Sequence, residues 1–272
     1  MTEEEKQKII EHNRNFIKGY EEEIESDQKK MLPQPPLVKA PMRDDGEKIA
    51  LPRDFSALSL NNDILSVING RHSSRVFTEE KMSLDELSFL LWATQGVKEI
   101  RGRAYATLRT VPSAGARHPF ETYLAVKNVD GLKAGKYHYL PMEHALEYLG
   151  EIEDRDKTVS DSLCGQEWAA KANAVFYWSI VPYRAEWRYD IYSHRVALID
   201  AGHLCENLYI AVTALGMGGC AVGALEPDMC DELFELDGFD EFTFYSMPVG
   251  KVREEDKAAE KAFYKFVEEQ NL

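Results

Sequence analysis

The pattern of hydrophobic and polar residues from Asn61 onward predicts a series of strands and helices. Five segments are rich in aromatic and branched residues and are bounded by turn-forming residues, as is typical of β-strands. They are ETYLAVK (121–127), GKYHYL (135–140), ALEYLG (145–150), AVFYWSIVP (174–182) and FTFYSMPVG (242–250). We expect these five strands to form one central sheet.

Three segments in the same region predict helices. NNDILSVING (61–70) suggests a short capped helix. In SLDELSFLLWATQGV (83–97), Ser83 stands at the N-cap, Glu86 at the capping-box position and Gly96 at the end. Residues 194–218 carry apolar residues on most faces, which predicts a long helix buried against the sheet or a partner.

The first 55 residues follow a different pattern. Residues 2–30 are rich in Glu and Lys, and their apolar residues recur at steps of three and four, which predicts an amphipathic helix. A proline-rich strap, residues 31–55, follows, and we expect it to be extended and to lie over the body. A solvated tail is the alternative. We therefore expect an N-terminal arm, residues 1–55, and one domain, residues 56–272.

Charge and composition exclude several classes of protein. With 32 basic and 47 acidic side chains the net charge is −15, which disfavours binding to nucleic acid and to anionic membranes. No apolar run approaches the roughly 20 residues of a spanning helix, and the acidic N-terminus does not resemble a signal peptide, so we expect a cytoplasmic protein. The four cysteines and seven histidines lack metal-site spacing, so we expect free thiols and no metal.

Basic residues gather in two places in this acidic chain. Residues 100–120 contain four arginines, at positions 101, 103, 109 and 117, and no acidic residue. The run Arg71-His72-Ser73-Ser74-Arg75 follows what we interpret as an Asn69-Gly70 turn. Guanidinium groups next to hydroxyl donors suit a phosphate monoester. A solvated basic turn is the alternative for this run.

Two further segments contain small residues in functionally suggestive places. Pro112 to Pro119 (PSAGARHP) directly precedes a predicted strand, and such a loop lets the backbone approach a flat ligand closely. LGMGGCAVG (215–223) has four glycines at the end of the long helix, without the strand-to-helix context of a dinucleotide-binding fold. A helix stop followed by a bulge would also explain these glycines.

These three motifs, RHSSR, PSAGARHP and the glycine-rich loop after a long helix, occur in this order in the nitroreductase family, which the chain resembles from about Asn61 to Lys251. The strap sequence LPQPPL and residues 194–218 resemble the SagB/ThcOx-type branch, which includes azoline oxidases. The resemblance implies an α+β fold, with a five-stranded, mostly antiparallel sheet flanked by helices. It also implies an intertwined homodimer with FMN at the interface.

The resemblance implies a role for thirteen residues in binding FMN. Those that would hold the phosphate and ribityl chain are Arg71, His72, Ser73 and Arg75. Those that would border the isoalloxazine of the same or the partner subunit are Pro112, Ser113, Ala114 and Gly115. Those that would approach the ring edge, where a backbone N–H near N5 stabilises the reduced form, are Ala221, Val222 and Gly223. Lys251 and Arg253 could complete the phosphate site, or could be a solvated pair.

The sequence departs from the family pattern in two places. Ala116 stands where many relatives have Asn, so a polar contact is lost or is supplied by Arg117 or His118. Azoline oxidases of this branch have a Lys-Tyr pair for proton removal, whereas this chain has Arg188-Tyr189. An arginine stays protonated below about pH 12, so Arg188 can bind an anion or polarise a substrate but is a poor base. Tyr189 is a candidate proton donor, with plain packing as its alternative.

Three hypotheses for function follow from these residues. The first is an FMN-dependent enzyme that takes electrons from NADH or NADPH and reduces a small-molecule acceptor, a quinone or a nitroaromatic compound, by a ping-pong mechanism. The second is a SagB-type dehydrogenase that oxidises azoline rings in a peptide, which Arg188 argues against. The third is a non-catalytic flavin-binding or storage protein.

Overall fold

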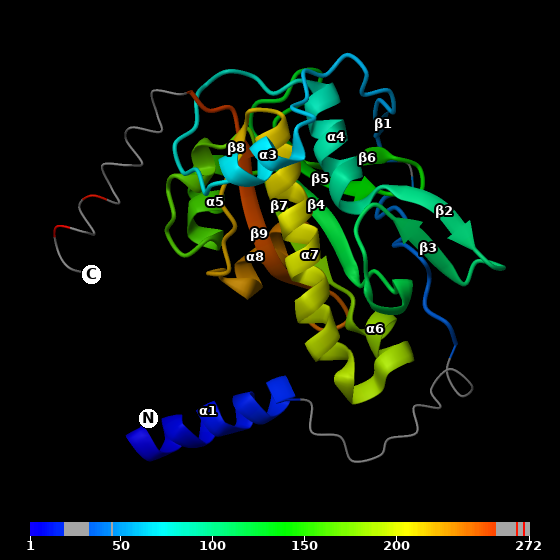
Figure 1. Ribbon diagram of the computed structural model, residues 1–272, viewed down its shortest axis with the longest axis vertical. Coiled ribbons are helices and arrows are strands. Elements are labelled where there is room, and N and C mark those ends of the chain that lie inside the picture. Colours follow the sequence, from blue (N-terminus) through cyan, green and yellow to red (C-terminus); the bar gives the residue numbers. More distant parts are fainter. Residues whose placement is uncertain (19–32, 45, 254–264, 266–268, 270–272) are drawn as a thin grey trace.

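The computed structural model describes residues 1–18, 33–44, 46–253, 265 and 269 (Figure 1). Its centre is an antiparallel sheet that contains all five predicted strands. They are β4 (Phe120–Val126), β5 (Gly135–Leu140), β6 (Ala145–Gly150), β7 (Ala174–Ile180) and β9 (Phe242–Gly250). Two short strands, β1 (Lys48–Ala50) and β8 (Gly218–Gly219), add to its edges, so the sheet has seven strands in the order β1-β6-β5-β4-β7-β9-β8.

Helices surround this sheet, which makes the fold α+β. The helices are α1 (Glu3–Lys18), α3 (Ile64–Gly70), α4 (Leu84–Gln95), α5 (Arg155–Ser162), α6 (Pro182–Tyr189), α7 (Ser193–Ala214) and α8 (Pro227–Phe234). Three short 3₁₀ turns are η1 (Ala114–Ala116), η2 (Ala169–Lys171) and η3 (Asp190–Tyr192). A separate hairpin is formed by β2 (Val97–Arg101) and β3 (Ala106–Arg109).

Each face of the sheet packs against its own hydrophobic core. On one face, Leu204 and Leu208 of α7 and Leu91 of α4 cluster with Phe176 of β7, and Figure 1 shows α7 crossing that face. On the other face, α5 and α8 join a second cluster with residues of β4 and β7. In β7 all seven residues are buried, because helices cover both faces.

Local sequence signals explain most of the helix boundaries. Helix α4 has the predicted capping box, in which the Ser83 side chain accepts from the Glu86 backbone while the Glu86 side chain accepts from Ser83. The predicted end of the long helix at residue 218 was too late, because α7 ends at Ala214 and Gly218–Gly219 pair with β9. The predicted Asn69-Gly70 turn is the last turn of α3.

The N-terminal arm contains helix α1 and, in the described part of the strap, the short strand β1. Helix α1 confirms the prediction for residues 3–18 and has no buried residue, while residues 19–30 of the predicted helix lie outside the described residues. The described part of the strap lies against the body, where the Tyr183 hydroxyl donates to the Pro33 carbonyl (2.7 Å). Among the described helices, none has the length and apolar character to cross a membrane.

Candidate active site

The basic segment 71–75 directly follows α3 and packs against Tyr209 of α7. The Ser73 hydroxyl lies 3.1 Å from the Tyr209 hydroxyl, and the Arg71 guanidinium lies 5.3 Å from the centre of the Tyr209 ring. His72 is held by its ring nitrogens, one 2.8 Å from the Gly70 carbonyl and the other 3.0 Å from the Ser74 hydroxyl. Arg75 is exposed. The segment therefore presents two guanidinium groups beside hydroxyl donors, which is a donor set for a phosphate.

The glycine-rich loop lies directly against this segment. The Ser74 N–H donates to the Gly219 carbonyl (2.9 Å), and a Cβ on Gly218 would come within 2.6 Å of the Ser74 Cβ, so only glycine allows the two backbones to approach. The Tyr209 hydroxyl accepts from the Ala221 N–H (2.8 Å). The Val222 N–H donates to Ser246 of β9. Gly223 is exposed, and a Cβ added there would meet no atom within 4 Å, so the loop is open to solvent at this residue.

Residues after β9 extend the same cluster. Gly250 pairs with Gly218, which brings the chain that follows β9 next to the basic segment. The Lys251 ammonium forms an ion pair with Glu86 of α4 (2.6 Å), and its carbonyl accepts from Thr78 (2.9 Å). Arg253 is exposed. The structure thus brings together three of the motif groups, the basic segment, the glycine-rich loop and the Lys251–Arg253 pair.

The Pro112–Gly115 loop is held at a different place, by Asp200 of α7. One Asp200 carboxylate oxygen accepts from the Ser113 hydroxyl (2.6 Å), and the other accepts from the Ala114 N–H (3.0 Å). Burial raises the pKa of Asp200, and the hydrogen bonds from Ser113 and Ala114 only partly offset this. Gly115, Ala116 and His118 all have positive φ, at 56°, 53° and 45°. Such strained backbone is often found at functional sites.

Helix α6 brings the two candidate catalytic residues to this loop. The Tyr189 hydroxyl lies against Gly115, where an added Cβ would come within 2.7 Å of it. The Arg188 guanidinium lies 5.8 Å from the centre of the Tyr189 ring. Tyr189 therefore packs against the Pro112–Gly115 loop, and Arg188 lies next to Tyr189.

Arg117 and His118, the expected substitutes for the family Asn, are buried beneath the loop. Arg117 lies over the rings of Tyr105 and Trp187 (4.6 and 5.2 Å) and donates to the Gly115 and Tyr105 carbonyls. The His118 ring bonds to the Thr107 carbonyl (3.1 Å), and burial lowers its pKa to about 2. Both side chains hold the loop and the β2–β3 hairpin in place.

The structure thus arranges the predicted residues in two clusters, joined by α7. Their anchors, Tyr209 and Asp200, are nine residues apart, which corresponds to about 14 Å along the helix and to opposite sides of it. The sequence analysis missed both anchors, because an apolar helical pattern indicates burial and does not single out a hydroxyl or a carboxylate. The only signal was polarity, since each stands among apolar neighbours of a buried helix.

The chemistry of the first cluster fits FMN. A phosphate needs cationic and hydroxyl donors, which Arg71, Ser73 and Arg75 supply, and the backbone approach at Gly218 leaves the segment and the loop as one continuous surface. The described residues contain no group of three or more His, Cys, Asp or Glu side chains that could hold a metal ion.

Comparison with known proteins agrees with the fold and the motifs. The profile of the Nitroreductase family matches residues 68–251. MJ1384 of Methanocaldococcus jannaschii, which is named as a nitroreductase, is 30% identical over 216 residues that cover 76% of this chain and 98% of that protein. A nitroreductase-like structure from Ralstonia eutropha, 24% identical, covers 82% of this chain and 99% of its own with a TM-score of 0.63. The chain therefore belongs to the nitroreductase family.

A further relative supports the SagB-like branch, and a further solved structure shares the fold. The trifolitoxin-processing protein TfxB of Rhizobium leguminosarum is 28% identical over 193 residues, which cover 68% of this chain and 51% of that protein. The chain thus spans about half the length of TfxB. The Escherichia coli microcin synthetase complex McbBCD, solved with truncated pro-MccB17 bound, contains a chain with a TM-score of 0.56 at 19% identity, covering 93% of this chain and 95% of its own. This last likeness concerns the fold.

Proposed function

We propose that the protein is an FMN-dependent oxidoreductase that takes electrons from NADH or NADPH and passes them to a small electrophile, a quinone or a nitroaromatic compound. The observation that carries this proposal is the cluster in which the basic segment 71–75, the glycine-rich loop and the residues after β9 meet around Tyr209. Membership of the nitroreductase family supports it.

In this scheme, the residues of the chain bind FMN and orient it. Arg71, His72, Ser73 and Arg75 hold the phosphate and ribityl chain, and Arg253 adds positive charge beside them, whereas the Lys251 ammonium is paired with Glu86. The Gly223 amide faces the ring edge. When bound, FMN supplies the transfer of hydride and electrons. Because one open cleft serves donor and acceptor in turn, we expect ping-pong kinetics.

Helix α6 supplies the substrate side of the site. Arg188 binds an anionic group or polarises an oxygen of the acceptor. The Tyr189 hydroxyl, at the Pro112–Gly115 loop, is the candidate proton donor.

We also propose that the working unit is a homodimer. The two clusters lie on opposite sides of α7, so a flavin bound at the Tyr209 cluster of one protomer would meet the Pro112–Gly115 loop of its partner. Apolar side chains on α3 and α7 are exposed and would be covered by this pairing, namely Ile64, Leu65, Ile68, Leu198 and Ile199.

An anaerobic absorbance titration tests the proposal. FMN-reconstituted protein is titrated with NADH and then NADPH while the flavin band near about 450 nm is followed. We expect bleaching by at least one donor. Flavin that binds and is not reduced by either donor would favour a storage protein, and failure to bind FMN would overturn the proposal.

A matched pair of variants assigns the phosphate site. Arg71→Gln removes a charge-assisted hydrogen bond and should weaken FMN binding by about 10- to 100-fold. Arg101→Gln, an exposed arginine at the end of β2, should leave FMN affinity unchanged. Equal FMN affinity in the two variants would remove Arg71 from the site.

A second candidate function is oxidation of azoline rings in a peptide, which the likeness to TfxB favours. The substrate would be a thiazoline or oxazoline in a partner peptide, with oxygen as the electron acceptor. Arg188 stands where a base is needed, so we expect no oxygen uptake with a thiazoline peptide. Oxygen uptake that is lost in Arg188→Gln would reverse the order of the two candidates.

A further inference from the structure

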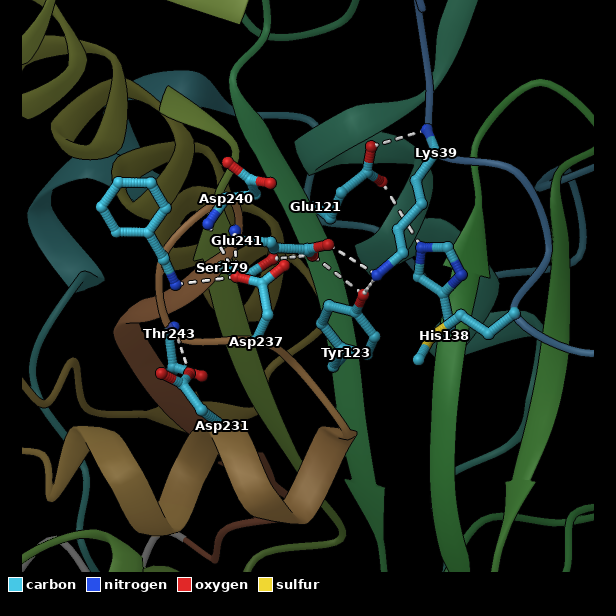
Figure 2. Close-up of polar contacts among 12 residues, drawn as sticks. Lys39, Glu121, Tyr123, His138, Ser179, Asp231, Asp237, Asp240, Glu241 and Thr243 are labelled. Atoms are coloured by element: carbon cyan, nitrogen blue, oxygen red, sulfur yellow. Dashed lines mark hydrogen bonds and ion pairs between the residues drawn. The ribbon is translucent and has the colours of Figure 1, made fainter. Parts of the chain in front are cut away.

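A group of buried charged side chains lies where the strap crosses the sheet (Figure 2). Three are acidic, Glu121 of β4, Glu147 of β6 and Glu241 just before β9, and all are buried. The basic members are His138 of β5, Arg184 of α6 and Lys39 of the strap. We call these six residues the strap cluster. It lies outside both clusters of the candidate active site.

Lys39 joins the strap to this cluster with both its backbone and its side chain. Its N–H donates to the Glu121 carboxylate (2.9 Å), and its ammonium donates to Glu241 (2.5 Å) and to the Tyr123 hydroxyl (2.7 Å). The next strap residues, Met42 and Arg43, donate their N–H groups to Glu147 (2.9 and 2.6 Å). The strap is therefore held by carboxylates that the sheet has already buried.

The Lys39 ammonium is one of the positive charges that face the buried carboxylates of the strap cluster. Burial by itself would lower the pKa of His138, but the carboxylates of Glu121 and Glu147, each 3.5 Å from a ring nitrogen, outweigh burial and raise that pKa. His138 therefore holds its proton to a higher pH than a free imidazole. The buried Arg109 guanidinium also acts on Glu121, and the Lys39 ammonium forms an ion pair with Glu241. Removal of Lys39 leaves the buried Glu241 carboxylate without this ion pair, which is unfavourable.

The same carboxylate connects the strap to the candidate active site. The Glu121 oxygen that accepts from Lys39 also accepts from the Arg184 guanidinium (2.5 Å), and Arg184 is itself buried. A second Arg184 nitrogen donates to the His118 carbonyl (3.2 Å), at the end of the Pro112–Gly115 loop. Arg188 and Tyr189 follow on the next turn of α6, about 6 Å further along the helix.

We propose that Lys39 is a positioning residue, which, through Glu121 and Arg184, fixes α6 and thereby sets Arg188 and Tyr189 against the Pro112–Gly115 loop. The proposal rests on the proposed function only for the role of Arg188 and Tyr189. The coupling between the strap and α6 is inferred only from the contacts described above.

Hydrogen–deuterium exchange of the full FMN-loaded chain tests the coupling. Lys39→Met should speed exchange of the amides in residues 183–189 by about tenfold or more, while Lys39→Arg should stay close to wild type. Arg43→Met is the matched control, because Arg43 also joins the strap to the body, through a half-exposed ion pair with Glu235, whereas the Lys39 ammonium binds Glu241 and Tyr123. Lys39 contacts Glu121 through its backbone N–H, which we expect to move when the ammonium no longer anchors the strap. Protection of α6 that is unchanged in Lys39→Met, while the strap itself exchanges faster, would overturn the proposal.

A second measurement needs no variant, which matters if Lys39→Met does not fold. In the wild-type protein, amides of residues 37–43 and 183–189 should open together, with the same free energy of opening and the same response to low denaturant. Independent opening of the two segments contradicts the coupling.

Enzyme kinetics then distinguish a positioning role of Lys39 from a general loss of structure. With NADH or NADPH as donor, Lys39→Met should raise KM for anionic 4-nitrobenzoate more than for neutral nitrobenzene, because Arg188 sits on the displaced helix, and Lys39→Arg should restore it. FMN affinity should not change, since the FMN phosphate residues lie elsewhere. An equal change for both acceptors, or loss of FMN, would contradict the proposal. Absence of any reduction by the wild type would refute the proposed function and leave the exchange results to decide the coupling.

Discussion

At the scale of single residues, the loop at 112–118 combines a strained backbone with a clear sequence motif. Ala116 has a φ of 53°, a left-handed conformation that costs an L-residue roughly 1 to 2 kcal/mol and that glycine adopts freely. Ala116→Gly should therefore raise the free energy of unfolding by about 0.5 to 1 kcal/mol. Urea denaturation, followed by circular dichroism, measures this change in the free energy of unfolding.

The neighbouring alanine provides the control for this change. Ala114 lies in the same loop without a positive φ, so Ala114→Gly should lower stability through the extra freedom of the unfolded chain. If Ala116→Gly and Ala114→Gly destabilise equally, the strain argument fails. FMN affinity should be similar in both variants, because neither change removes a side-chain donor.

Residue-scale reasoning found candidate residues where the chemistry is local in sequence and missed those where it is not. The run 71–75 and the loop 112–115 each show their residue types within a few positions. Tyr209 and Asp200 anchor these segments through Ser73 and Ser113, which lie 136 and 87 residues away in the sequence. Nothing in the sequence near either residue records that contact.

At the scale of elements, buried histidines on neighbouring segments give stability a defined dependence on pH. The pKa of His138 in β5 is raised, so its contribution is complete below the unfolded value of about 6.5 and is lost as pH rises through the folded value. His118 and His144 act in the opposite sense, because burial lowers their pKa values to about 2 and about 4. The unfolded chain takes up their protons first as pH falls below about 6.5.

We therefore expect the free energy of unfolding to be highest at about pH 6.5. On either side it should fall by up to about 1.4 kcal/mol per pH unit for each titrating group. Guanidinium denaturation at about pH 5.5, 6.5 and 8 measures both limbs. His138→Gln should flatten the alkaline limb, whereas His12→Gln on exposed α1 should retain it. An alkaline limb that persists unchanged in His138→Gln would assign it to another group.

Elements were predictable from the sequence where their residue pattern is clear, since six-residue strands were predicted whereas the eight-residue helices α5, α6 and α8 were not. The five strands of six to nine residues and the capped helix α4 carry enough pattern to be recognised, as the structure confirms. Strands β1 and β8 have three and two residues, too few to show a period of two, and they form because a neighbouring edge offers hydrogen bonds. The same pairing ended α7 four residues before the predicted position.

At the scale of the whole molecule, the single chain leaves several large apolar side chains exposed. Ile199 is 51% exposed on the side of α7 between the two anchor residues, and Leu65 of α3 is 65% exposed. Between α4 and α7 lies a pocket of about 370 Å³, lined in part by Phe89, Trp92 and Ile210. A monomer would leave these side chains in water, whereas a two-fold pair could bury them.

The dimer proposal therefore predicts that one charge on this surface affects both association and cofactor binding. Ile199→Glu should shift sedimentation equilibrium from dimer to monomer and should lower FMN affinity at the same time, since the flavin would lose the partner's Pro112–Gly115 loop. Phe239→Glu provides the comparison, because Phe239 is more exposed, at 83%, and belongs to the turn before β9, outside α3 and α7. It should remain a dimer with bound FMN. A wild-type monomer that binds FMN tightly would show that one protomer completes the site, and the two clusters on α7 would then need separate ligands.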